Sequence, residues 1–598
     1  MKNFIGNFWA SLLAFVVGLV VVGFLNVLVF AGLMANMSLG KMDTFVQIAD
    51  STVMTVDMKT IFKEGRSTSE LNINDMTIEV DLSLEESESV DYLKAVNAIL
   101  CAADDDRIVA INLKPDGLTM DIAQLVEFRN ALAMFAKKKP IYVFTENFES
   151  LGAYFLSSIA NYIQIGRLGN IPWVGLSTTS MHFKGLLEKL GAEVEVFRCG
   201  KFKSAVEPFT ERKMSAENRK QTELLLNTTW GYIVSGVAQA RGVDSAMLQK
   251  LASDLTICSV QEAVKHKFVD KIGDAEQFEQ MFADIYGGDK KKIKTVSLKD
   301  YMTTFTMEGK KSSNGKREYI GVIYAAGDIM PSDDGSMGDV ITAEDMLTKL
   351  KKAEKDSTVK AVVLRVNSPG GSALDSEIIC AQVEKLRKVK PVVVSMGNEA
   401  ASGGYYISAL ADRIITSPLT LTGSIGVFSL GVNVQGLLTK QLGVTFDNVK
   451  TNKSADFGFG RMSPAQRAYI QKSVDDIYVV FKQRVSQGRN LTMEQVEEVA
   501  SGRVWTGIDA QRIGLVDGVG GLNVALEVAS QLAHIEEVNI KEISNSRDML
   551  PALMKRLKRF VKTESELPLL DENIKYLKSV VGMSGKVMAI TPVVLNIH

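Results

Sequence analysis

Residues 391–406 read PVVVSMGNEAASGGYY and combine a short apolar strand, a turn of small residues and the start of a helix. Residues 140–155 read PIYVFTENFESLGAYF and repeat the same order of apolar and small positions. Leu151 of the earlier stretch stands where Ser402 stands in the later one. A serine followed by two glycines directly after a strand is well placed to act as a nucleophile. The two stretches therefore predict a duplicated enzyme in which only the later copy is reactive.

Two further pairs of segments extend this likeness between the two parts of the chain. IVAINLKPDG at residues 108–117 pairs with VVLRVNSPGG at 362–371, and the triplet Lys-Ser-Ala occurs at 203–205 and again at 453–455. The pairs keep the same order over roughly 100 residues of each part, as a tandem repeat would. We therefore expect two repeats of one unit within the 598 residues.

The repeats and the composition around them predict five parts of the chain. A polar, glycine-rich stretch before the second repeat is typical of a linker. The expected parts are a membrane anchor at 1–40, a first repeat at 50–302, a linker at 303–318, a second repeat at 319–540 and a helical tail at 541–598.

Apolar runs alternate with helical patterns inside the second repeat. Strands are expected at 359–366, 391–394 and 414–417, and helices at 375–389 and 403–411. Strands that alternate with helices in this way form parallel sheets joined by crossover helices. The fold class is therefore α/β, built from tandem βαβ domains.

The N-terminal region predicts contact with a membrane. Residues 8–34 contain no charged side chain and exceed the roughly 20 residues that span a bilayer. A cleaved signal peptide, the alternative, has a shorter apolar core of about 7–15 residues. Lys2 precedes the run and Lys41 follows it, and we expect the body to lie outside the cytoplasm. A basic amphipathic stretch at 554–562 would lie either on an anionic membrane surface or against the body or a neighbouring subunit.

The remaining composition excludes several classes of function. The formal net charge is -2, so no global positive field attracts nucleic acid. None of the four cysteines forms a Cys-x-x-Cys pair, and neither a metal nor an organic cofactor is indicated. No histidine lies between His266 and His534, the interval that contains Ser402. If Ser402 is a nucleophile, its base is therefore expected to be another residue type.

Acyl transfer by Ser402 also requires N–H donors for the negatively charged oxygen of the intermediate. The N–H of Gly403, directly after the serine, is one candidate. Gly370 and Gly371 are further candidates, because they follow a predicted strand at the edge where open α/β sheets bind ligands. Taken alone, small residues at strand ends are more often packing positions than catalytic ones.

Four motifs together resemble the long, duplicated form of the signal peptide peptidase A family (SppA, protease IV). They are AASGGYY at 400–406, NSPGGS at 367–372, LTGSIGVF at 421–428 and KSAVEPF at 203–209. The resemblance covers nearly the whole chain. It implies crotonase- or Clp-protease-like repeats behind one transmembrane helix, no cofactor, and a homotetramer shaped like a bowl.

The resemblance also assigns roles to individual residues. Ser402 matches the nucleophile, Lys203 the general base and Ser424 the serine that orients the lysine. A lysine titrates near 10.4 in water and acts as a base at neutral pH only where burial lowers its pKa. The residues alone leave Lys453 as a second candidate, because it repeats the Lys-Ser-Ala motif within the copy that carries Ser402. The longer match after Lys203 favours that residue.

The implied function is a membrane-anchored serine endopeptidase that degrades cleaved signal peptides and other apolar peptides. The implied location is the bacterial inner membrane, with the catalytic body on the periplasmic side. Two alternatives compete with this reading. One is an acyl-CoA enzyme, which would use oxyanion-hole glycines without a serine nucleophile, and the other is a membrane scaffold without catalysis.

Overall fold

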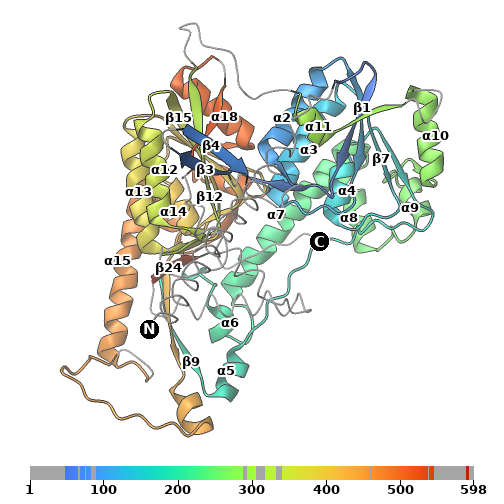
Figure 1. Ribbon diagram of the computed structural model, residues 1–598. Coiled ribbons are helices and arrows are strands. Elements are labelled where there is room, and N and C mark those ends of the chain that lie inside the picture. Colours follow the sequence, from blue (N-terminus) through green and yellow to red (C-terminus); the bar gives the residue numbers. More distant parts are fainter. Residues whose placement is uncertain are drawn as a thin grey trace, which may run out of the picture.

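The computed structural model describes most of the body of the chain (Figure 1). The described residues are 47–64, 68–73, 76–81, 89–286, 293–304, 317–331, 340–456, 460–536, 538–544 and 587–590. The predicted anchor at 8–34 and the basic stretch at 554–562 lie outside them. Within these ranges, no helix combines the length and the apolar character needed to cross a membrane.

The first half is a six-stranded sheet in which every pair of neighbouring strands is parallel. Its order is β10 (Lys271–Ile272), β8 (Tyr162–Ile165), β7 (Ile141–Thr145), β6 (Ile108–Lys114), β1 (Thr52–Asp57) and β11 (Lys294–Ser297). The helices of this half are α2 (Tyr92–Asp104), α3 (Ile122–Ala136), α4 (Leu151–Ser157), α8 (Ser245–Ser253), α9 (Val260–Lys265), α10 (Ala275–Tyr286) and α11 (Leu298–Met302). The parallel pairing confirms the predicted βαβ organisation.

The second half repeats this plan with a larger sheet. The main order is β21 (Val504–Thr506), β19 (Leu421–Gly423), β17 (Val392–Ala401), β15 (Val359–Ser368), β12 (Tyr319–Ala326) and β23 (Ile540–Glu542), with β18 (Arg413–Thr416) joining β17 to β22 (Gly518–Val519). The helices are α12 (Ala343–Lys355), α13 (Ala373–Arg387), α14 (Gly403–Ser408), α15 (Pro464–Arg489), α16 (Met493–Val499), α17 (Gly507–Arg512) and α18 (Leu522–Ala533). β15 and β17 are almost entirely buried, as expected for strands covered on both faces.

Equivalent hydrogen bonds in the two halves support the duplication. Tyr154 and Tyr405 each donate a hydrogen bond from the phenol to a backbone carbonyl of a later loop, over 3.1 and 2.8 Å. Leu151 and Ser402 each lie three residues before these tyrosines. The structure therefore aligns Leu151 with Ser402, as the sequence does, and Leu151 is buried in the core of the first half.

A third sheet joins segments of both repeats. Its order is β14 (Val340–Ile341), β13 (Asp328–Ile329), β16 (Gly370–Ser372), β24 (Val587–Ile590), β20 (Phe428–Asn433) and β9 (Glu193–Arg198). β9 belongs to the first repeat in sequence but pairs antiparallel with β20 of the second. The helices α5 (Lys184–Leu190) and α6 (Glu207–Thr210) lie near it, and α7 (Ala216–Arg241) leads back to the first half (Figure 1). The boundary between repeats in sequence is therefore not the boundary between halves in space.

Two small sheets and a π-helix complete the described part of the chain. β2 (Ile61–Lys63) pairs with β5 (Ser89–Asp91), β3 (Thr68–Ile73) pairs with β4 (Met76–Asp81), and a π-helix covers Leu437–Gln441. The predicted helical tail at 541–598 needs a correction in its described residues. These residues hold the end of β23 and all of β24, because each of these extended segments pairs with a neighbouring strand.

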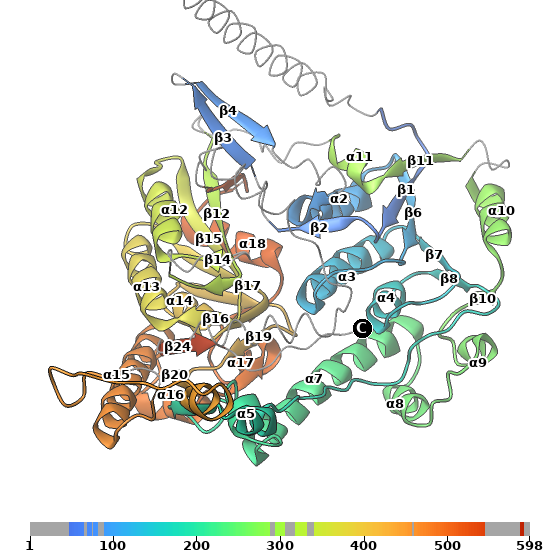
Figure 2. The same ribbon diagram turned by 60° about the horizontal axis from the view of Figure 1, so that its bottom comes forward.

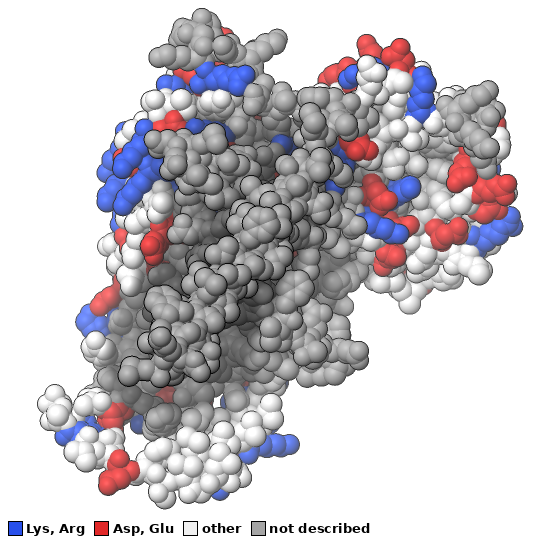
Figure 3. Space-filling model, viewed as in Figure 1, with Lys and Arg blue, Asp and Glu red and all other residues white. Residues whose placement is uncertain are grey.

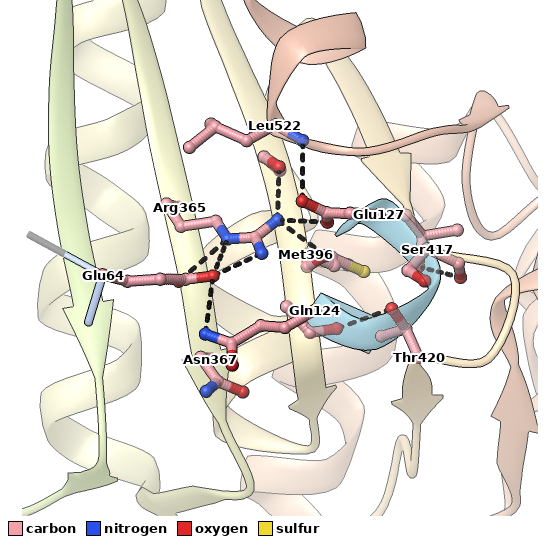
Figure 4. A network of polar contacts seen from close by, with 12 residues as sticks. Glu64, Gln124, Glu127, Arg365, Asn367, Met396, Ser417, Thr420 and Leu522 are labelled. Atoms are coloured by element: carbon pink, nitrogen blue, oxygen red, sulfur yellow. Dashed lines mark hydrogen bonds and ion pairs between the residues drawn. The ribbon is translucent and has the colours of Figure 1, made fainter. Parts of the chain in front are cut away.

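A buried charged network fixes the two halves against each other (Figure 4). Arg365 on β15 has no exposed side-chain surface and forms ion pairs with Glu64, at 2.5 Å, and Glu127, at 3.0 Å. The same guanidinium donates to the Ser395 hydroxyl over 2.9 Å. Although burial opposes the charge, the two carboxylates raise the pKa of Arg365, while burial raises the pKa of Glu127. Both carboxylates come from the first repeat, so this cluster links the two repeats in the core.

Candidate active site

Ser402 lies at the junction between β17 and α14, where the backbone is strained. Its φ is 54° and its ψ is −112°, outside the regions that non-glycine residues usually occupy. The conformation is held on both sides, since the Ser402 N–H donates to Gly423 over 2.8 Å and its carbonyl accepts from the Tyr406 N–H over 2.8 Å. The surrounding glycines allow this tight turn from strand to helix.

Lys203 reaches this junction from the first repeat because β9 is paired with β20. The loop after β9 then rests on the backbone of the second repeat, and the Phe202 N–H donates to the carbonyl of Ser501 over 3.0 Å. A Cβ on Gly502 would stand 2.6 Å from the Cβ of Lys203. Gly502 therefore provides the space that the lysine backbone occupies.

The three predicted residues meet in one buried cluster. Nζ of Lys203 lies 2.7 Å from Oγ of Ser402, 2.9 Å from Oγ of Ser424 and 3.1 Å from the carbonyl oxygen of Ser424. All three side chains have no exposed surface. Burial lowers the pKa of Lys203 well below its usual value.

These contacts match the hydrogen-bonding capacity of a neutral amine. Its two N–H groups can donate to the two oxygens of Ser424, and its lone pair then faces the hydroxyl of Ser402. Ser424 is itself held in a left-handed conformation with φ 49°, and its N–H donates to the carbonyl of Arg503 over 2.7 Å. In this arrangement Lys203 can accept the proton of Ser402.

The candidate oxyanion glycines also lie together. A Cβ on Gly403 would stand 3.1 Å from the Cα of Gly370, so the first turn of α14 faces β16. Gly370 has φ +107° and Gly371 has φ +156°, and a Cβ on Gly370 would stand only 2.6 Å from the amide nitrogen of Gly403. The structure thus brings all three predicted glycines to one edge beside Ser402.

Lys453, the second candidate base, is exposed, whereas the cluster around Ser402 is fully buried. The loop after Lys203 instead depends on Glu207, to which the sequence assigned no role. The buried carboxylate of Glu207 accepts hydrogen bonds from the Ser215 hydroxyl over 2.5 Å and the Asn218 amide over 3.0 Å. Gly502 carried no distinguishing signal, because Lys203, which it faces, lies far away in sequence. Glu207 was missed although its partners follow only 8 and 11 positions later.

A serine hydroxyl held against a buried lysine at a sheet edge is the arrangement expected in a serine hydrolase that uses an amine base. The comparisons with known proteins identify the family. The model of peptidase family S49 matches residues 133–284 and 384–536, one region in each repeat. The chain belongs to peptidase family S49 and is a serine protease that acts on peptide bonds.

Several relatives are similar over most of their length. Protease 4 of Salmonella typhi is 35% identical over 77% of this chain and 75% of the relative. Protease 4 of Haemophilus influenzae is 34% identical over 73% of this chain and 72% of the relative. The chloroplastic serine protease SPPA of Arabidopsis thaliana is 30% identical over 76% of this chain and 68% of the relative. These proteins place the chain among the SppA-type proteases.

Solved structures match smaller parts of the chain. The 1510-N membrane-bound stomatin-specific protease in complex with a substrate peptide is 16% identical, covers 40% of this chain and 99% of its own, and has a TM-score of 0.27. ClpP1 from Listeria monocytogenes is 14% identical over 34% of this chain and 94% of its own, with a TM-score of 0.22.

Proposed function

We propose that this protein is a membrane-anchored endopeptidase whose Ser–Lys dyad is assembled from its two repeats. The observation that carries the proposal is the 2.7 Å contact between Nζ of Lys203 and Oγ of Ser402 inside a fully buried cluster. The lowered pKa of Lys203 supports its role as a base at neutral pH.

In the proposed mechanism, Oγ of Ser402 attacks the carbonyl carbon of the scissile peptide bond while Lys203 takes the hydroxyl proton. The N–H of Gly403 and an N–H of the turn at Gly370 and Gly371 stabilise the negative oxygen of the tetrahedral intermediate. Lys203 returns the proton to the leaving amine, and an acyl-enzyme remains. Water, deprotonated by the same lysine, then releases the second product. Ser424 keeps the amine directed at Ser402 throughout.

The proposed substrates are cleaved signal peptides and other apolar peptides. A relative in Enterococcus faecium, named as a putative signal peptide peptidase SppA, is 38% identical over 205 residues and supports this class. An apolar stretch at 8–34 would hold the site close to peptides that partition into lipid. The proposed location is the bacterial inner membrane with the body in the periplasm, and the proposed assembly is a homotetramer.

The charge distribution of the surface agrees with peptides rather than nucleic acid as substrate. The face in Figure 3 carries both acidic and basic side chains on each half. With a formal net charge of -2, the chain has no overall positive field that would attract a polyanion.

Labelling with a serine-reactive fluorophosphonate tests the dyad in the full chain in detergent. We expect mass spectrometry to find the label on Ser402, no label in Ser402→Ala, and labelling at least 100-fold slower in Lys203→Met. Labelling of Lys203→Met at the wild-type rate at pH 7 would show that Lys203 is not the base. Extraction of membranes with carbonate tests the anchor, since the full chain should stay in the pellet and a chain that lacks residues 1–40 should not.

A further inference from the structure

The third sheet contains a position for one strand directly beside the candidate oxyanion glycines Gly370 and Gly371. β24 lies between β16 and β20 and pairs antiparallel with both (Figure 2). Gly371 pairs with Ala589, and Phe428 pairs with Met588. Without β24, the edges of β16 and β20 would face each other one strand apart. Two such edges form a site for an extended peptide, because both can hydrogen-bond to its backbone.

The backbone of β24 approaches the candidate oxyanion donors. A Cβ on Gly370 would stand 1.9 Å from the carbonyl oxygen of Ala589 and 2.6 Å from the amide nitrogen of Gly403. The carbonyl oxygen of Ala589 and the amide nitrogen of Gly403, the residue that follows Ser402, therefore both lie close to the same point beside Gly370. The backbone of β24 at Ala589 therefore runs directly against Gly370, a candidate oxyanion donor, and close to Gly403.

The side chains of β24 occupy two different apolar environments. Ala589 is fully buried and packs within the core of the second half. Met588 is 1% exposed and belongs to a separate apolar cluster with Ala205, Val206 and Phe428. Ala205 and Val206 follow Lys203 in the chain, so both repeats build the pocket that holds the methionine. The groove thus accommodates a small apolar side chain at position 589 and a long one at position 588, in two separate apolar environments.

A purely structural strand is the alternative interpretation of β24. Against it stands the complete burial of Ser402 and Lys203, which gives a peptide no access in this arrangement. A peptide can reach the serine only after a covering segment moves. β24 is the strand whose departure leaves a slot one strand wide, bordered by Gly370 and Gly371 and close to Gly403, the residue after Ser402.

We propose that β24 occupies the peptide-binding groove of this protease as an internal competitor of the substrate. The proposal rests on the protease function proposed above and adds which peptide sequences the groove accepts. Substrates bind as an extended strand antiparallel to β16 and β20. They place a small apolar residue where Ala589 lies and a long apolar residue where Met588 lies. An incoming peptide must displace residues 587–590 before it is cut.

Kinetics of the full chain in detergent test the competition. Met588→Asp places a carboxylate in an apolar pocket and should release β24, while it leaves Ser402, Lys203 and Ser424 in place. We expect KM for a fluorogenic peptide with Met-Ala before the cleaved bond to fall at least fivefold at unchanged kcat, because a larger fraction of the enzyme is free to bind. Met588→Ala, a milder change, should lower KM less. Leu168→Asp, at a residue that is 99% exposed, is the matched control and should leave KM unchanged.

Peptide binding provides a second readout that does not depend on catalysis. In a Ser402→Ala background, a fluorescent peptide with the sequence KVMAI of residues 586–590 should bind at least fivefold more tightly when Met588→Asp is added. The same peptide with aspartate in place of methionine should bind at least tenfold more weakly. Equal affinity in the two backgrounds, or no binding of KVMAI, would overturn the proposal. Absent hydrolysis in every variant, with KVMAI binding intact, would contradict only the proposed dyad.

Discussion

Lys203 and Ser402 are 199 positions apart in the chain, yet Nζ of one lies 2.7 Å from Oγ of the other. The contact exists because β9 of the first repeat pairs with β20 of the second, and because the loop after β9 rests against Gly502. The first repeat has leucine in place of the nucleophile, and the second has its Lys-Ser-Ala lysine on the surface. In the proposed dyad, each repeat therefore supplies the group that the other lacks.

Substitution of Lys203 by methionine should lower the activity but raise the stability of the fold. We expect kcat to fall by about 10³-fold or more, as when the base of a serine hydrolase is removed. The free energy of unfolding at pH 7 should rise by about 1–2 kcal/mol, because an apolar chain replaces a buried amine that resists protonation. Peptide hydrolysis and denaturant titration of the same samples check both effects. Loss of stability with activity retained would contradict the assigned role.

The pH dependence of activity follows from the depressed pKa of Lys203. Only the neutral amine accepts a proton, so kcat/KM should rise with pH and reach its plateau well below pH 10.5. Ser424→Ala removes an acceptor that would also stabilise the charged amine, so the rising part of the profile should not move to higher pH. Its kcat should fall about 10–100-fold. A rise in activity centred near pH 10.5 in the wild type would show that the lysine is not desolvated.

The lowered pKa of Lys203 also makes the free energy of unfolding depend on pH. The unfolded chain keeps the proton on Lys203 up to about its normal pKa, whereas the folded chain releases it at lower pH. Between these two values the unfolded state binds more protons, so the contribution of Lys203 to stability increases with pH. Comparison of wild type and Lys203→Met from pH 6 to pH 10 should show the stability difference shrinking as pH rises.

Gly370→Ala should prevent peptide binding more than it weakens the fold. The added Cβ would stand 1.9 Å from the carbonyl oxygen of Ala589, and a peptide in the same groove would meet it too. We expect kcat/KM to fall more than 100-fold. Gly175→Ala is the matched control, since Gly175 has φ +90° and no atom within 4 Å of the new Cβ. The control should cost about 1–2 kcal/mol of strain and change kcat/KM less than twofold.

Arg365→Met should destabilise the contact between the halves. It leaves Glu64 and Glu127 without their guanidinium partner, and breaking a buried pair costs about 3–5 kcal/mol. Arg107→Met is the control, because its ion pair with Asp105 is at the surface and such pairs contribute less than about 1 kcal/mol. Calorimetry should show a lower melting temperature for Arg365→Met alone. Equal melting temperatures of the two variants would contradict the structural role of the network.

The part of the site that the sequence predicts consists of residues in continuous motifs. Ser402, Ser424 and the three glycines follow strands of one repeat, where alternating apolar runs already indicate a sheet edge. The residues alone leave both Lys203 and Lys453 open, because each follows a strand-like run of sequence and precedes the same Ser-Ala pair, and only the longer family match after Lys203 favours that residue. What separates them is the pairing of β9 with β20, a contact between repeats.

β24 is a second feature that depends on contacts between distant segments, and the sequence does not reveal it. Four residues, Val-Met-Ala-Ile, have too little pattern to indicate a strand, and the expected tail was helical. Their conformation depends on the edges of β16 and β20, which the chain forms more than 150 positions earlier. Strand formation is set by such partners more than by intrinsic preference. The expected helix 403–411 likewise ends at Ser408, and the strand expected at 391–394 continues to Ala401.

Hydrolysis of an apolar fluorogenic peptide by four variants at matched oligomeric state tests the shared dyad most directly. The account predicts that Ser402→Ala and Lys203→Met lose at least about 10³-fold in kcat. Lys453→Met, the matched lysine of the other repeat, should keep wild-type activity, and so should Leu168→Asp. An inactive Lys453→Met together with an active Lys203→Met would contradict a dyad assembled across the two repeats within one chain.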